Sequence, residues 1–201
     1  MAAVHQIDHY IVPLVELWDL GHKLFRSTQA TYPARFIAGD IFDPSFLTAV
    51  PYVRTSSTSA HLPTLDLNSV TSLNDLHGRV SAIYTGAFFH LFSEEKQREV
   101  AKLLAGLLFP EPGSIIAGVH GGNARKGLWP PIIGGYKMFC HSPESWTELW
   151  RDVFNDGKGE EEVSIEINVR LRKEVGGYDY FGTYPGNTDP YCVLEWYVAR
   201  K

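Results

Sequence analysis

The segment from residue 79 to residue 119 constrains the fold of this chain more than any other. It opens with the apolar run Val80-Ser-Ala-Ile-Tyr84, and Ser93 then precedes Glu94 and Glu95, which suit the cap and first turn of a helix. The helix carries an apolar stripe with helical spacing, formed by Val100, Leu103, Leu104, Leu107 and Leu108. Pro110 ends it, and Ser114-Ile-Ile-Ala-Gly-Val119 reads as the next buried strand. This order of strand, helix and strand predicts a crossover unit of a parallel sheet.

The rest of the chain repeats this alternation. Apolar runs predict strands at 3–7 and 35–39, and helical spacing predicts a helix at 13–26. Residues 50–78 read as loop, with a helical turn at 71–76, and a second capped helix begins at Ser142-Pro143-Glu144 with the stripe Trp146, Leu149, Trp150, Val153 and Phe154. Apolar residues alternate at 163–171 and again at 192–198, which is typical of antiparallel strands. The sequence thus predicts an α/β fold, a three-layer sandwich with a mostly parallel sheet and an antiparallel C-terminal strand pair.

Composition narrows the class of protein. A length of 201 residues with 44% apolar and 20% charged residues predicts one globular domain over residues 1–201. A net charge of -5 disfavours nucleic acid as a partner, and no apolar run reaches the roughly 20 residues of a membrane span. Cys140 and Cys192 form no CxxC pair, so we expect neither a disulfide framework nor a metal site. Small-molecule partners and a cytoplasmic location are the expectations that follow.

Familiar catalytic motifs do not occur in the sequence. There is no phosphate loop, GxSxG elbow, HExxH or GxGxxG. Glycine pairs occur at 121–122, 134–135 and 176–177, but none lies between a strand and a helix, and we interpret all three as turns.

Polar and small residues gather where predicted strands end. Asp8 follows the first strand, Asp40 the second, the segment 85–90 the third and His120-Gly121-Gly122 the fourth. In an open parallel sheet these ends form one rim, where ligands bind. A carboxylate there can accept hydrogen bonds from a ribose or an adenine, although Asp8 as a cap and Asp40 in an Asx turn remain alternatives.

Three stretches resemble class I S-adenosylmethionine-dependent methyltransferases, above all the fungal enzymes of secondary metabolism that act on small molecules. They are Asp40-Ile-Phe-Asp43, the block 79–119, and His141-Ser-Pro-Glu-Ser-Trp-Thr-Glu-Leu-Trp150. The resemblance implies a Rossmann-like fold and methyl transfer from S-adenosylmethionine to an oxygen or carboxylate of a hydrophobic small molecule. It also implies cofactor-binding roles for Asp8 (ribose), Asp40 and Ile41 (adenine), and Thr85, Gly86 and Ala87 (methionine half).

His90 and His120 are the candidates for a catalytic base. Methyl transfer is an in-line displacement, in which the protein positions the nucleophile and can supply a base. A structural role is the alternative for each histidine, and a carboxylate acceptor needs no base.

The chain departs from the family pattern at its N-terminus. Members of the family begin with a strand and a glycine-rich loop, whereas this sequence starts at the equivalent of their second strand, so we expect an N-terminally truncated fold. Three explanations stay open: a truncated chain, a degenerate protein, or a subunit of a homo-oligomer that completes its sheet by association. The alternative function is accordingly a binding module, or a cofactor-independent cyclase or isomerase, without methyl transfer.

Overall fold

The structure is a computed structural model that describes residues 2–3, 14–28, 30–32, 34–52, 64–129, 137–155, 163–173 and 192–201. Contacts divide the chain into two compact units. Unit 1 comprises Met1–Thr48 and Thr64–Leu76, and unit 2 comprises Ala49–Pro63 and His77–Lys201. The prediction of a single domain over 1–201 stays a prediction.

Unit 1 contains the short elements β1 (Ala2–Ala3), α1 (Leu14–Phe25), β2 (Ile37–Ala38) and the 3-10 helix η2 (Leu73–Leu76). β1 and β2 pair in parallel, and Trp18 of α1 stacks on Phe36 with ring centroids 5.6 Å apart. Asn74 of η2 donates from its amide to the Pro44 carbonyl at 3.0 Å. The predicted helix at 13–26, strand at 35–39 and helical turn at 71–76 are confirmed, while most of the predicted strand at 3–7 lies outside the described residues.

Unit 2 is built on a mixed sheet. Its strands, in spatial order, are β3 (Ala82–Gly86), β4 (Ile115–Gly122), β8 (Cys192–Arg200) and β7 (Ile165–Lys173). β3 runs parallel to β4, whereas β8 is antiparallel to both β4 and β7. The predicted C-terminal antiparallel pair is confirmed. Because β8 inserts directly beside β4, the larger sheet is less parallel than predicted.

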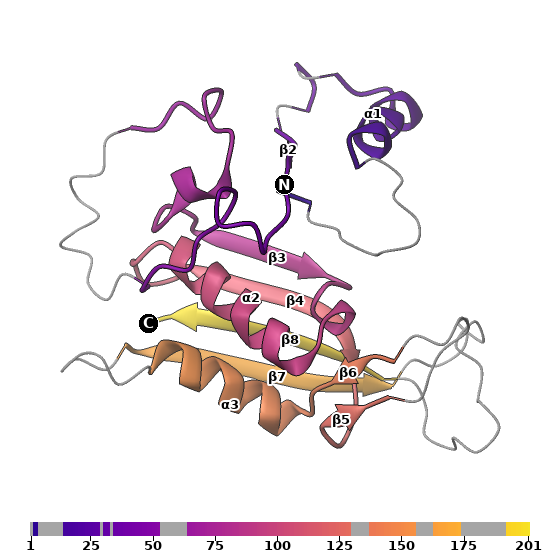
Figure 1. Cartoon of the computed structure of the whole chain (residues 1–201), viewed down its shortest axis with the longest axis vertical. Helices are drawn as coiled ribbons and strands as arrows, with labels where there is room; N and C mark the ends of the chain where they lie inside the picture. The colour runs from indigo at the N-terminus through magenta and orange to yellow at the C-terminus, as the bar shows by residue number, and fades with distance from the viewer. Residues whose placement is uncertain are drawn as a thin grey trace. The chain divides into compact units, whose positions relative to one another are not determined.

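Helices α2 (Glu94–Leu107) and α3 (Pro143–Phe154) lie side by side across one face of this sheet (Figure 1). Their predicted apolar stripes are confirmed, because every residue of both stripes is buried. They pack against strand residues of the same face, among them Ile116, Leu194 and Val198, which are wholly buried. The core of unit 2 therefore lies between the helices and this face.

The opposite face of the sheet is partly polar. On β7 and β8, Arg170 and Arg172 both pair with Glu195, with N–O distances of 2.8 and 2.6 Å. In the described part of unit 2, α2 and α3 both lie on the other face, so the three-layer arrangement stays a prediction.

Two local features differ from the sequence predictions. Gly121 and Gly122 lie inside β4, so their interpretation as a turn is wrong; the pairs at 134–135 and 176–177 lie outside the described residues. Gly121 and Gly122 stay extended because they pair with Val193 and Cys192 of β8. A Cβ on Gly122 would lie 2.4 Å from Leu194 Cγ. The antiparallel pair β5 (Gly127–Leu128) and β6 (Phe139–Cys140) was not predicted, because two-residue strands carry no periodic signal.

Candidate functional site

The carboxyl end of β3 leads into a tight turn. The Ala87 N–H donates to the Val119 carbonyl of β4 at 2.7 Å. Ala87 has a φ of 51°, in the left-handed region that residues with a Cβ seldom adopt. Such backbone conformations cost on the order of 1–3 kcal/mol and cluster at functional sites. The turn after β3 is therefore the centre of the candidate site.

Gly86 and Thr85 present different groups at this turn. Gly86 is exposed, and a Cβ on it would lie 3.3 Å from the Tyr84 ring. Thr85 points to the other face of the strand, where its hydroxyl packs so closely on Gly118 that a Cβ there would lie 2.5 Å from Oγ1. That Oγ1 is buried without a hydrogen-bond partner. A ligand at the turn would therefore meet the open surface of Gly86 and the backbone of Thr85.

His90 lies three residues beyond Ala87, in the 3-10 helix η3 (Phe89–Leu91). Its Nδ1 accepts a hydrogen bond of 2.7 Å from the Gly121 N–H of β4. Val119 and Gly121 are two residues apart in β4, so their backbone groups face the same side of the strand. Burial lowers the pKa of His90, which favours the neutral ring. The structure thus brings Thr85, Gly86, Ala87 and His90 together at the ends of β3 and β4.

His120 is buried in an aromatic cluster next to this site. Its exposed fraction is 1%, and its ring centroid lies 4.6 Å from that of Trp146 and 5.6 Å from that of Phe89. The Trp196 indole N–H donates to His120 Nδ1 at 3.0 Å, and Nε2 is buried without a partner. Burial holds the pKa of His120 well below its usual range. These contacts match the structural alternative, and the catalytic role stays a prediction.

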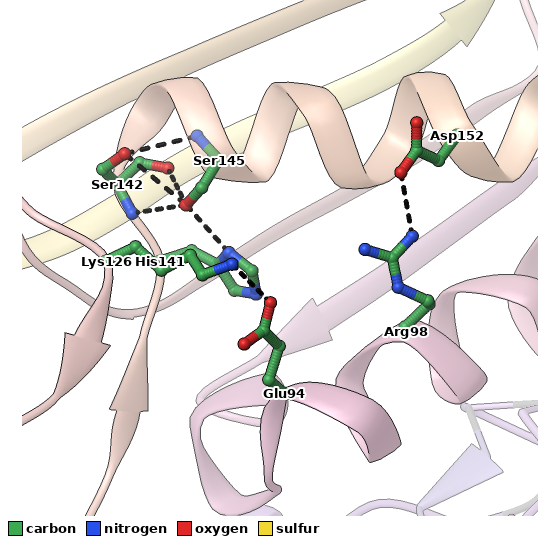
Figure 2. A network of polar contacts seen from close by, with 7 residues as sticks. All are labelled: Glu94, Arg98, Lys126, His141, Ser142, Ser145 and Asp152. Carbon is green, nitrogen blue, oxygen red and sulfur yellow. Dashed lines mark hydrogen bonds and ion pairs between the residues drawn. The ribbon is translucent and has the colours of Figure 1, made fainter.

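A third histidine belongs to the cap of α3 (Figure 2). Ser142 and Ser145 form a capping box, in which each hydroxyl accepts the backbone N–H of the other residue. His141 Nδ1 lies 2.9 Å from Ser145 Oγ, and burial lowers the pKa of His141 to about 4. Because the Ser145 hydroxyl already serves the helix cap, this pair is a structural unit rather than a nucleophile and its base.

Figure 2 also shows two ion pairs, one near that cap and one further along α3. Lys126 Nζ lies 2.5 Å from Glu94 Oε1, and Arg98 of α2 lies 3.0 Å from Asp152 of α3. All four side chains are at least one third exposed, so each pair contributes little to stability.

The remaining predicted cofactor residues belong to unit 1. Asp40 Oδ1 accepts the Phe42 N–H at 2.9 Å, which is the Asx turn given above as the alternative. Its second carboxylate oxygen has no hydrogen bond to a described residue. Ile41 is buried, with an exposed fraction of 2%. Asp8 lies outside the described residues.

Two hollows are lined by described residues of unit 2, and one of them reaches Val119, whose carbonyl accepts the Ala87 N–H. One, of about 430 Å³, lies over the sheet and is lined by residues such as Tyr84, Ala117, Asn168 and Tyr197. Another, of about 440 Å³, is lined by residues at the end of α3 and the start of β7, among them Arg151, Asn155 and Ser164. Neither contains a predicted site residue.

Sequence reasoning missed Gly118 and Trp196, and it placed Gly121 at the rim without its contact to His90. Gly118 makes room for Thr85, Gly121 donates to His90, and Trp196 donates to His120. The glycine pair at 121–122 was a visible signal, but it was interpreted as a turn. Trp196 is 76 residues from His120 in the sequence, so only the pairing of β4 with β8 shows that they meet.

Among the residues that the structure describes, no cluster of metal-ligating side chains occurs and no helix could cross a membrane. No family model matches the sequence. Individual relatives do match. The O-methyltransferase phiE of a fungal species (strain ATCC 74256) is 31% identical over 166 residues, which cover 80% of this chain and 46% of the relative.

The Asnovolin E/Chermesin D methyltransferase nvfJ of Aspergillus novofumigatus is 28% identical over 81% of this chain and 50% of its own length. The O-methyltransferase atr3 of Stereocaulon alpinum is 28% identical over 69% of this chain and 33% of its own length. The homologues of this chain are fungal methyltransferases. The chain spans about half the length of the first two of these curated relatives.

Proposed function

We propose that this chain takes part in S-adenosylmethionine-dependent methyl transfer to an oxygen or carboxylate of a hydrophobic small molecule. Two independent lines support the proposal: the relatives named as methyltransferases, and a strained turn at the carboxyl end of β3. The observation that carries it is the turn itself, where Ala87 holds a φ of 51° directly after the exposed Gly86. Ligands of α/β sheets bind at this position.

The residues at the turn fit part of the cofactor. A glycine without a side chain at position 86 leaves the backbone open to close approach by the methionine half, next to Thr85 and Ala87. In unit 1, the second carboxylate oxygen of Asp40 is available to accept a hydrogen bond from the cofactor, beside Ile41. Asp8 keeps its proposed role at the ribose.

In methyl transfer of this kind the main task of the protein side chains is to position the reactants. S-adenosylmethionine, when bound, supplies an electrophilic methyl group on a sulfonium. The protein then has to orient the acceptor oxygen in line with that group and keep water away. We assign the orientation of the acceptor to the segment from Gly86 to His90, and we propose His120 as a residue that supports this segment from the core.

Isothermal titration calorimetry with S-adenosylmethionine and S-adenosylhomocysteine tests the proposal. We expect both to bind. Asp40→Ala removes a hydrogen-bond acceptor and Gly86→Val covers the open backbone, so we expect each variant to weaken binding at least about tenfold. Asp43→Ala is the matched control, because Asp43 is an exposed carboxylate of the same loop whose Oδ1 is engaged by Ser45. Absence of heat for both ligands up to millimolar concentration would overturn the proposal.

A further inference from the structure

The ring of His90 is held in one protonation pattern by a backbone group. The last backbone hydrogen bond between β3 and β4 is accepted by Val119, and the next N–H on that side of β4, that of Gly121, donates to His90 Nδ1 at 2.7 Å. A backbone N–H in a strand cannot rotate away, and it can only donate. Nδ1 must therefore carry a lone pair, and in the neutral ring the proton is on Nε2.

Nε2 of His90 makes no hydrogen bond to a described residue. The side chain is half-buried. Some polar atoms of the protein are buried without a hydrogen-bond partner, and Nε2 of His90 is not among them. His120 differs in this respect: Trp196 imposes the same tautomer on it, but its Nε2 is buried. Of the two histidines, His90 is therefore the better candidate to present its Nε2 N–H group to a ligand.

We propose that His90 donates a hydrogen bond from Nε2 to the acceptor oxygen and removes no proton from it, so that the acceptor oxygen is one that is already ionised. This rests on the proposed function. A general base at Nε2 would need the opposite tautomer, with a proton on Nδ1 pointing at the Gly121 N–H. Two donors facing each other at 2.7 Å would leave both without an acceptor. Donation to a negatively charged oxygen is the stronger kind of hydrogen bond and places that oxygen near the turn after β3.

Nitrogen-15 NMR of the histidine rings tests the inference without any enzyme assay. The chain has eight histidines, and loss of a signal in His90→Ala assigns His90. At pH 7 we expect its Nε2 to carry the proton. Benzoate, an aromatic carboxylate, should shift that Nε2 signal, and it should bind about tenfold more weakly to His90→Ala.

Two further variants separate a donor from a structural cap. His90→Asn keeps an acceptor for Gly121 and a donor of its own, and we expect it to recover part of the benzoate affinity. Leu91→Ala, in the same 3-10 turn, should leave the affinity for benzoate within about twofold of that of the wild-type chain. Binding of S-adenosylhomocysteine, measured in the same samples, reports on the proposed function separately. A proton on Nδ1, a charged ring at pH 7, or no response of His90 to benzoate would overturn the inference whether or not the cofactor binds.

Discussion

At the scale of single residues, a buried histidine makes the stability of unit 2 depend on pH. Burial lowers the pKa of His141 from the ordinary 6.5 to about 4. Between these values the unfolded chain binds a proton here that the folded chain does not, so the free energy of unfolding falls as pH is lowered through this window. Urea denaturation should show the full contribution of His141 above about pH 6.5, and a loss of up to about 3 kcal/mol near pH 4.

His141→Asn provides the comparison, because asparagine can still bond to Ser145 but does not titrate. We expect the variant to lose less stability than the wild-type chain between pH 7 and pH 4. Equal losses in both proteins would mean that other groups cause the acid sensitivity.

Gly118 is a second single position with a measurable role. A Cβ there would meet Thr85 Oγ1 at 2.5 Å and the Trp196 ring at 2.7 Å, between β3 and β8. We predict that Gly118→Ala lowers the free energy of unfolding by about 1–3 kcal/mol, the usual cost of overpacking. Gly21→Ala is the control, since a Cβ at Gly21 meets nothing within 4 Å and alanine favours helix. A Gly118→Ala protein as stable as the wild type would refute the close packing described for β4.

At the scale of elements, the start of α3 depends on its capping box. Ser142→Ala removes the oxygen that accepts the Ser145 N–H at 3.2 Å, and we predict a loss of about 1 kcal/mol in thermal or urea unfolding. Ser142→Asp retains an acceptor and should be close to neutral. If alanine and aspartate behave alike, the cap contributes nothing to stability.

Most helices and strands could be predicted because each carries its own periodic pattern. The stripe from Val100 to Leu108 identifies α2, with Ser93 as its cap, and the stripe from Trp146 to Phe154 identifies α3, with Ser142 as its cap. The position of Gly121 and Gly122 could not be predicted in the same way. Glycine pairs favour turns when taken alone, and only the register with β8, which is far away in the sequence, keeps them extended.

At the scale of the whole molecule, the rule that ligands bind at strand ends predicts which residues of unit 2 lie near one another, but not the contacts between them. Thr85, Gly86, Ala87 and His90 do meet at the ends of β3 and β4. The hydrogen bond from Gly121 to His90 and the strain at Ala87 depend on tertiary packing, which no local pattern encodes. Our proposal that His90 acts as a donor therefore rests on a contact in the structure and not on a sequence pattern.

Cofactor binding at the turn after β3 is the claim on which the proposed function depends. The most direct test is a two-dimensional nitrogen-15 NMR spectrum of the whole chain, recorded during a titration with S-adenosylhomocysteine. We predict saturable shifts of the backbone amides of Thr85, Gly86 and Ala87, and of Asp40 in unit 1, while Arg151 and Ser164 beside the hollow at the end of α3 stay unchanged. Unchanged amides at Thr85, Gly86 and Ala87 at millimolar ligand, or shifts confined to other parts of the chain, would contradict it.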